Sequence, residues 1–166
     1  MARKGSLDEV YPEQSRGARN MTKNMNVRIT KIHPNATIPE YHTSGAAAFD
    51  LSVIEDVTIV PKESAFLRTG LVFGIPDSHV MLIFGRSSLF KKHGLRLGNQ
   101  VGVLDSDFCG PEDECLIFVW NPGDSPIEVK ALTRLAQAII IPRPRVIFEE
   151  GEPLGKTRGG WGSTGQ

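Results

Sequence analysis

The chain has 166 residues, 40% of them hydrophobic and 23% charged, which suits one domain with a buried core. Its 19 basic and 19 acidic side chains cancel. This excludes a global field that attracts nucleic acid or anionic membranes, so any phosphate site must be local. No apolar run approaches the roughly 20 residues that cross a bilayer. No apolar stretch follows the first residues, MARKG, as it would in a secretory signal. We therefore expect a cytoplasmic protein with no nucleic-acid or membrane partner.

The first 25 residues are polar and mixed in charge, and few of them are apolar. They predict a flexible N-terminal tail at 1–25, followed by a β domain at 26–150. Order is expected to begin at residues 27–32, VRITKI, where apolar and polar side chains alternate with the period of a half-buried strand.

Short strand-like runs follow, separated by turn signals such as PKE, IPDS and NPGD. The runs cover residues 57–60, 65–67, 79–84, 115–120, 127–129 and 138–141. Short strands at regular spacing predict an all-β, jelly-roll-like barrel with at most one short helix, near residues 88–93. The two cysteines, Cys109 and Cys115, lack a paired ligand set, so we expect reduced thiols rather than a zinc site.

The end of the chain, residues 151–166, is expected to be a flexible glycine-rich arm. Residues 155–166 contain five glycines together with Lys156, Arg158 and Trp161. Glycines let backbone amides approach phosphate oxygens, cations add charge-assisted donors, and an aromatic face can stack on a base. A polar terminus without a binding role fits the same composition.

Three further segments carry groups suited to phosphate or base chemistry. Residues 85–89, GRSSL, follow a strand-like run and can present amides, hydroxyls and a guanidinium to a phosphate. Residues 99–110, NQVGVLDSDFCG, are expected to form a hairpin in which a carboxylate can activate water and an asparagine amide can read a base. An Asx-type turn and a solvated surface loop explain the same two segments without function. Residues 134–137, RLAQ, say little alone.

Five segments in this order resemble the five motifs of the trimeric dUTP diphosphatase (dUTPase) family. AAFDL at 47–51 is similar to AGYDL, GRSSL at 85–89 to PRSGL, and RLAQ at 134–137 to RIAQ. The segment 99–110 is similar to NxxGxIDxDYxG, and GGWGSTG at 159–165 to GGFGSTG. The resemblance runs from about residue 27 to the C-terminus.

This resemblance implies a homotrimer whose active sites each draw on all three chains, with the C-terminal arm closing over the nucleotide. It implies hydrolysis of dUTP to dUMP and pyrophosphate, in a pathway that supplies dUMP and keeps uracil out of DNA. Mg²⁺ then bridges the triphosphate oxygens and water, so no direct protein ligand to the metal is expected.

Carried over position by position, the resemblance makes Asp105 the carboxylate that activates the catalytic water, with Asp50 supporting the site. The remaining matched residues bind substrate. They divide into phosphate contacts (Arg86, Ser87, Ser88, Gln137 and Arg158), uracil and deoxyribose contacts (Asn99, Gly102, Val103, Leu104 and Phe108), and contacts of the closing arm (Gly160, Trp161, Gly162 and Ser163).

Some positions depart from the family pattern. Ser88 stands where the family has glycine, Gly85 where it has proline, and Phe108 where it has tyrosine. Either Lys156 or Arg158 can serve the γ-phosphate, and the bidentate fork of arginine favours Arg158. Two alternatives stay open. One is a dCTP deaminase, or a bifunctional deaminase and diphosphatase, for which Glu112 and Glu114 provide carboxylates. The other is an inactive regulatory or binding module with the same fold.

Overall fold

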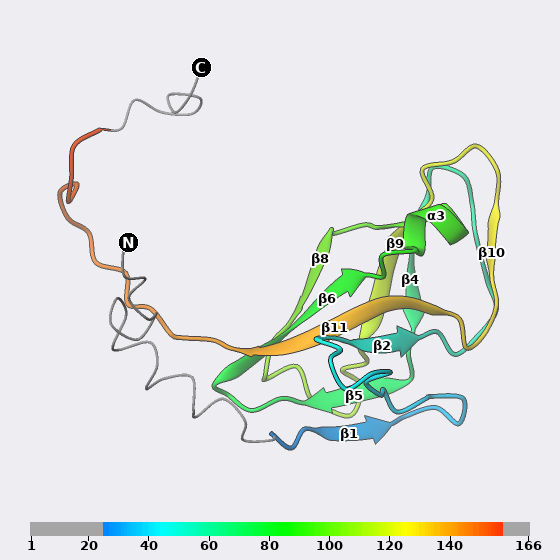
Figure 1. Cartoon of the computed structure of the whole chain (residues 1–166), viewed down its shortest axis with the longest axis horizontal. Helices are drawn as coiled ribbons and strands as arrows, with labels where there is room; N and C mark the ends of the chain where they lie inside the picture. The colour runs from blue at the N-terminus through cyan, green and yellow to red at the C-terminus, as the bar shows by residue number, and fades with distance from the viewer. Residues whose placement is uncertain (1–24, 158–166) are drawn as a thin grey trace, which may run out of the picture.

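Residues 25–157, which the computed structural model describes, form eleven short β-strands and one five-residue helix (Figure 1). The expected all-β fold with one short helix is therefore confirmed. In chain order the elements are β1 (Arg28–Lys31), β2 (Phe49–Ser52), β3 (Val57–Ile59), β4 (Ser64–Arg68), β5 (Leu71–Gly74), β6 (His79–Gly85), α3 (Leu89–His93), β7 (Arg96–Leu97), β8 (Val101–Leu104), β9 (Leu116–Trp120), β10 (Ile127–Val129) and β11 (Arg134–Pro142).

The strands pair in four antiparallel sheets. The largest has the order β2-β11-β6-β8, and a second has the order β4-β9-β7. Two-stranded pairs, β1-β5 and β10-β3, complete the fold. The inward side chains of these sheets form one core, whose fully buried members include Leu51, Phe73, Met81, Ile117 and Leu135. Most neighbours in the sheets are distant in sequence, so the fold rests on long-range pairing.

Each strand-like run named from the sequence lies on a strand, and the expected helix is α3. Three strands were not expected: β2, β5 and β7. β7 is only two residues long, and β2 places Asp50 between two buried side chains. The expected hairpin at residues 99–110 is wrong. That segment contains one strand, β8, which pairs with β6, and the residues after β8 form a turn.

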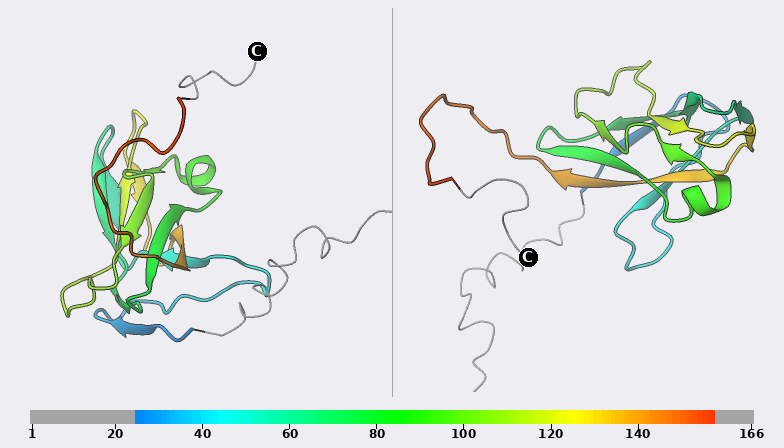
Figure 2. Two further views of the ribbon diagram at one scale, coloured as in Figure 1. Left: turned by 90° about the vertical axis from the view of Figure 1, so that its left-hand side faces the viewer. Right: turned by 90° about the horizontal axis from the view of Figure 1, so that it is seen from above.

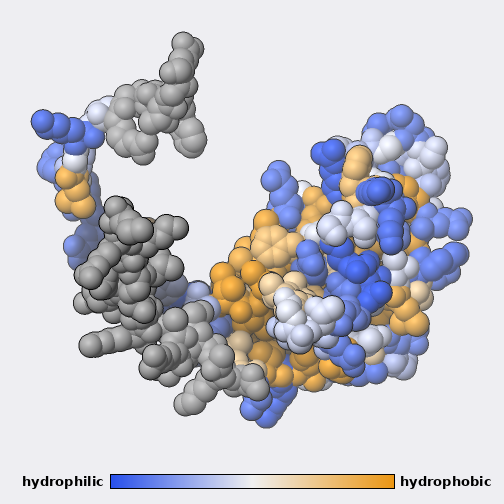
Figure 3. Space-filling model, viewed as in Figure 1, coloured by the Kyte–Doolittle hydropathy of each residue, from blue (hydrophilic) through white to orange (hydrophobic). Residues whose placement is uncertain are grey.

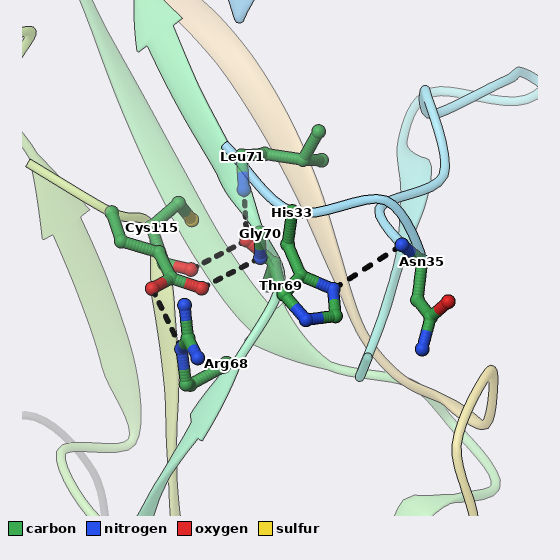
Figure 4. A network of polar contacts seen from close by, with 8 residues as sticks. His33, Asn35, Arg68, Thr69, Gly70, Leu71 and Cys115 are labelled. Carbon is green, nitrogen blue, oxygen red and sulfur yellow. Dashed lines mark hydrogen bonds and ion pairs between the residues drawn. The ribbon is translucent and has the colours of Figure 1, made fainter. Parts of the chain in front are cut away.

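A buried polar network fixes the start of β5 (Figure 4). The Glu114 carboxylate accepts hydrogen bonds from the Gly70 amide at 2.7 Å and from Arg68 Nε at 2.9 Å. The Thr69 hydroxyl donates to the Cys115 carbonyl at 2.6 Å. Gly70 has a φ of +68°, and an added Cβ would lie 2.8 Å from the Ala36 Cβ, so no side chain fits there.

After β11 the chain leaves the body of the protein (Figure 1, Figure 2). Residues 144–157 are exposed and have no strand or helix, and Ile147 and Phe148 are 89% and 92% exposed. Part of the expected C-terminal arm, from Arg158 onward, and the expected N-terminal tail before Met25 lie outside the described residues. No described helix is long and apolar enough to cross a membrane.

Candidate active site

Two arginines and a histidine surround one carboxylate, that of Asp50, on the β2-β11-β6-β8 sheet, and the four residues form the Asp50 cluster. The side chain of Asp50 is 11% exposed, and its Oδ1 lies 2.9 Å from Arg86 Nε. Its Oδ2 lies 3.1 Å from His42 Nε2 and 3.3 Å from Arg134 Nη1. Arg134 Nη1 also contacts His42 Nε2. One carboxylate therefore orients two guanidinium groups, and because the cations outnumber it, the cluster attracts anions.

The sheet register explains how these distant residues meet. β11 lies between β2 and β6, so Gln137 pairs with Asp50 on one side and with Phe84 on the other. Arg86 follows β6 directly. Its amide donates to the Leu135 carbonyl at 3.1 Å, and its Nη1 donates to the Arg134 carbonyl at 3.3 Å. Segments 47–51, 85–89 and 134–137 thus form one site within one chain.

Gln137 Nε2 donates to the Gly85 carbonyl at 3.4 Å, so this amide supports the loop that carries Arg86. Ser87 is exposed in that loop, and Ser88 is the N-cap of α3. The Ser88 φ of −92° is ordinary for any residue. Serine therefore stands at this position without backbone strain, although the related motif has glycine.

The second group of predicted residues lies on β8 and the turn that follows it. Gly102 faces inward, and an added Cβ would lie 3.1 Å from the Ile83 Cβ. The same position lies 3.6 Å from Asn99 Nδ2, so Gly102 packs between Ile83 and the asparagine amide. Val103 faces outward and is 62% exposed, whereas Leu104 is buried.

The turn after β8 presents two of the predicted site residues to solvent. Asp105 is exposed, and the Phe108 ring is 40% exposed. The Phe108 amide donates to the Asp105 carbonyl at 3.2 Å and closes the turn. An exposed carboxylate beside an exposed ring is available to a ligand from outside the chain.

Arg86 and the Asp105 turn lie at opposite ends of β6, whereas Asn99 lies near the Arg86 end, because Val101 pairs with Phe84. Arg86 follows the last residue of β6, whereas Asp105 follows Leu104, which pairs with Met81 near its start. Six residues along a strand span about 20 Å, since each residue rises roughly 3.3 Å. The structure therefore does not bring Asp105 to Arg86 within one chain.

Sequence reasoning missed two members of the Asp50 cluster, Arg134 and His42. Arg134 was matched to a motif but received no role, because its side chain meets Asp50 only through a register shift between Arg134 and Ala136. His42 lies in the loop before β2 and has no sequence signal of its own. The five predicted tail residues, Arg158, Gly160, Trp161, Gly162 and Ser163, lie outside the described residues.

Other carboxylates bear on two further questions, the deaminase alternative and a direct metal site. Glu114, considered for a deaminase, is bound by Arg68 and Gly70 and is not available to a base. Within residues 25–157, no group of three or more His, Cys, Asp and Glu side chains could hold a metal ion.

An antiparallel β-fold that orients two arginines on one carboxylate, with a second carboxylate exposed on a turn, is suited to bind an anionic ligand. Comparison with known proteins narrows this class. The dUTPase family model matches residues 34–166. The deoxyuridine 5'-triphosphate nucleotidohydrolase of Wolinella succinogenes is 37% identical over 147 residues, covering 87% of this chain and 97% of that protein. That of Nautilia profundicola is 40% identical, covering 86% of this chain and 100% of that protein.

Solved structures agree. A dUTPase from Streptococcus mutans, 27% identical, superimposes with a TM-score of 0.66 over 72% of this chain and 98% of its own. The dUTPase of Staphylococcus bacteriophage 80alpha with dUPNHPP has the same fold, with a TM-score of 0.76 at 22% identity over 86% of this chain and 99% of its own. The chain belongs to the dUTPase family.

Proposed function

We propose that this chain hydrolyses dUTP to dUMP and pyrophosphate, at sites formed between the subunits of a homotrimer. Family membership and the named activity of its relatives support the reaction. The observation that carries the shared site is the separation of Arg86 and Asp105 by the length of β6. A phosphate loop and a water-activating carboxylate must both reach one triphosphate, so each must come from a different copy.

An apolar sheet face supports assembly. The outward side of β6, β8 and β11 carries seven large apolar side chains, matched across strands by the register: Val80, Leu82, Phe84, Val101, Val103, Ile139 and Ile141. The inward side of the same sheet forms the core. An antiparallel sheet that leaves one face to water normally places polar side chains there. Hydrophobic surface gathers where these strands lie (Figure 3), as expected of a face that another subunit covers.

Both half-sites border this apolar face. Asp50 and Gln137 lie on the same sheet beyond one end of the apolar face. Asp105 follows Val103 and Leu104 beyond the opposite end. When neighbouring copies pack along this face, the Asp50 cluster of one chain can approach the Asp105 turn of another. Each closed ring of copies then contains as many complete sites as chains.

In this site Asp105 orients and deprotonates the attacking water, while Arg86, Ser87, Ser88 and Gln137 hold the phosphates. Arg134 and His42 join the phosphate side through Asp50. Hydrolysis of a phosphoanhydride demands placement and charge neutralisation, which oriented guanidinium groups supply without covalent help.

The nucleoside end is assigned to β8 and its turn. The Asn99 amide and the backbone of Gly102, Val103 and Leu104 read the uracil edge, and the Phe108 ring packs under the deoxyribose. Gly102 lets β8 pack closely on Ile83 in the core, where an added Cβ would lie 3.1 Å from the Ile83 Cβ, so glycine here keeps in place the strand that carries these backbone groups. Arg158, Gly160, Trp161, Gly162 and Ser163 complete the site as a closing arm.

Mg²⁺ is the proposed cofactor, held by triphosphate oxygens and water. The donor set fits this mode, because the turn after β8 offers only the exposed carboxylates Asp105 and Asp107, and Mg²⁺ keeps several waters when it binds nucleotides. When bound, the ion would supply positive charge beside the triphosphate, while the chain's own residues orient the water and the phosphates.

The reaction is tested with a panel of dUTP, dCTP, UTP and dTTP in Mg²⁺, measuring pyrophosphate and ammonia. We expect pyrophosphate from dUTP alone. Ammonia from dCTP would replace the proposal with a deaminase, and no turnover of any nucleotide would favour an inactive module.

The shared site is tested by mixing two inactive variants, Asp105→Asn and Arg86→Ala, after subunit exchange. Neither variant alone should hydrolyse dUTP. In randomly mixed rings about a quarter of the sites join an intact Asp105 to an intact Arg86, so about a quarter of wild-type activity should return. Mixtures that stay inactive while exchange is demonstrated by mass would place both residues of a site on one chain.

A further inference from the structure

A serine is buried inside the turn that presents Asp105. Ser106 is 6% exposed, whereas its neighbours Asp105 and Asp107 are exposed. Its hydroxyl oxygen accepts a hydrogen bond from Arg143 Nη2 at 3.2 Å. A buried hydroxyl needs such a partner, because leaving it unpaired costs free energy. The turn is therefore anchored from below by a guanidinium.

The backbone of Arg143 is fixed by the end of β11 and by a hydrogen bond to Ser78. β11 ends at Pro142, which pairs with His79, and the next amide, that of Arg143, donates to the Ser78 carbonyl at 2.8 Å. The Arg143 Nε atom is buried without a hydrogen-bond partner. An arginine at the start of an exposed segment ordinarily extends into water, so its inward placement has a desolvation cost that a role of its own must offset.

We propose that Arg143 is a positioning residue for Asp105 and acts through Ser106. This inference rests on the proposed role of Asp105 as the group that activates water. Between residues 25 and 157, the contact of Arg143 with Ser106 is the one side-chain hydrogen bond to residues 105–108, beside the backbone bond from Phe108 to Asp105. Loss of the arginine leaves the Asp105 turn held by its backbone alone.

The consequence concerns the chemical step more than binding. Among the proposed substrate contacts only Phe108 lies in this turn, whereas Arg86, Gln137 and Asn99 make no hydrogen bond to Arg143. A carboxylate displaced by about 1 Å from the water it must orient loses rate on the order of 100-fold. Removing Arg143 should therefore lower kcat and leave KM nearly unchanged.

The test compares kcat and KM for dUTP in the full-length chain for Arg143→Met, Ser106→Ala and the double variant. Methionine keeps an apolar stem and removes the donors. We expect Arg143→Met to lower kcat by about tenfold or more, with KM within about twofold of wild type. Because both changes break one contact, the double variant should be no slower than Arg143→Met alone.

Arg145→Met is the matched control. Arg145 is exposed two residues further along the same segment, so its replacement should leave kcat and KM unchanged. Arg143→Lys keeps a cationic donor and should recover part of the lost kcat. This recovery distinguishes a directed hydrogen bond from general packing.

Outcomes separate the inference from the function on which it rests. Asp105→Asn is measured in the same series. If it retains normal turnover, the proposed role of Asp105 is wrong, and the inference is lost with it. If Asp105→Asn is inactive while Arg143→Met keeps its kcat, the positioning role alone is wrong. If Arg143→Met raises KM and loses the oligomer, Arg143 is a structural residue and the proposal is wrong. If Arg143→Met fails to fold, Ser106→Ala decides, and a normal kcat in that variant would overturn the proposal.

Discussion

The Asp50 carboxylate and the Arg86 guanidinium join the first and second of the matched motifs through an ion pair of 2.9 Å. Asp50 lies on β2 and Arg86 directly follows β6, and these two strands are not neighbours, because β11 lies between them. A contact of this kind fixes the direction in which Arg86 presents its remaining donors. Asp50 therefore belongs to the phosphate half of the site although it would repel a phosphate itself.

The first prediction follows from this pair. Asp50→Asn removes the charge that orients Arg86 and Arg134, so KM for dUTP should rise about tenfold, and the free energy of unfolding should fall by about 1–2 kcal/mol. Steady-state kinetics and urea unfolding measure the two effects. Asp56→Asn, which breaks an exposed pair with Lys130, is the control and should change neither. An unchanged KM in Asp50→Asn would remove Asp50 from the site.

The second prediction concerns sugar discrimination. Phe108→Ala removes the exposed ring assigned to the deoxyribose, so the preference for dUTP over UTP in kcat/KM should fall by about tenfold or more. The ratio is measured with both nucleotides at matched Mg²⁺. Val60→Ala, at another exposed apolar position, should keep the wild-type ratio. Equal preference in Phe108→Ala and the wild type would assign sugar selection to other residues.

The third prediction concerns the end of the chain. Residues 151–157 are exposed and carry no strand or helix, so deletion from Gly155 onward should leave the melting temperature within about 2 °C of the full chain. The deletion should nevertheless lower kcat by about 100-fold, because closure over the nucleotide excludes water and completes the site. Differential scanning calorimetry and pyrophosphate release measure the two. A truncated chain with full activity would rule out the closing arm.

The fourth prediction concerns the buried thiol. Burial raises the pKa of the Cys115 thiol from its ordinary 9.0 to about 12, whereas Cys109 is exposed. At pH 8 iodoacetamide should therefore modify Cys109 only, and both thiols should react in denaturant. Mass spectrometry of the digested protein locates the modification. Rapid modification of Cys115 in the folded chain would contradict its burial.

The same raised pKa makes stability depend on pH. Above pH 9 the unfolded chain loses the Cys115 proton while the folded chain keeps it, so the unfolded state binds fewer protons and stability falls as pH rises toward 12. From pH 8 to pH 10 this one group should lower the free energy of unfolding by about 1.4 kcal/mol. Denaturant curves at the two pH values measure it, and Cys115→Ala should lose this part of the dependence while Cys109→Ser keeps it.

The sequence predicted the long strands well because their apolar runs are distinctive. Residues 79–84 and 115–120 are nearly unbroken apolar runs of strand length, and turn signals bound both runs. β2 was missed because Asp50 interrupts its apolar residues, although that aspartate was matched to a motif. The segment 99–110 was misread as a hairpin, since a local pattern cannot show that β8 prefers β6 as its partner.

Motif order predicted which residues matter better than it predicted which of them meet. Asp50, Arg86 and Gln137 gather in one chain because of a sheet order that only long-range pairing determines. His42 could not be found, because a single histidine in a loop carries no periodicity or motif. The Arg143 contact with Ser106 was equally hidden, since 37 residues separate the two.

Gly70 has a consequence for how inactive descendants of this chain would look. Its amide meets Glu114, its φ is positive, and the Ala36 side chain leaves no room for a methyl group. None of these constraints involves the nucleotide. A related chain that has lost the enzymatic activity can therefore accumulate substitutions at Asp105, but it must retain glycine at position 70 to keep this fold. A substitution at Asp105 would indicate that a related chain has lost the reaction, whereas a substitution at Gly70 would indicate that it no longer has this local fold.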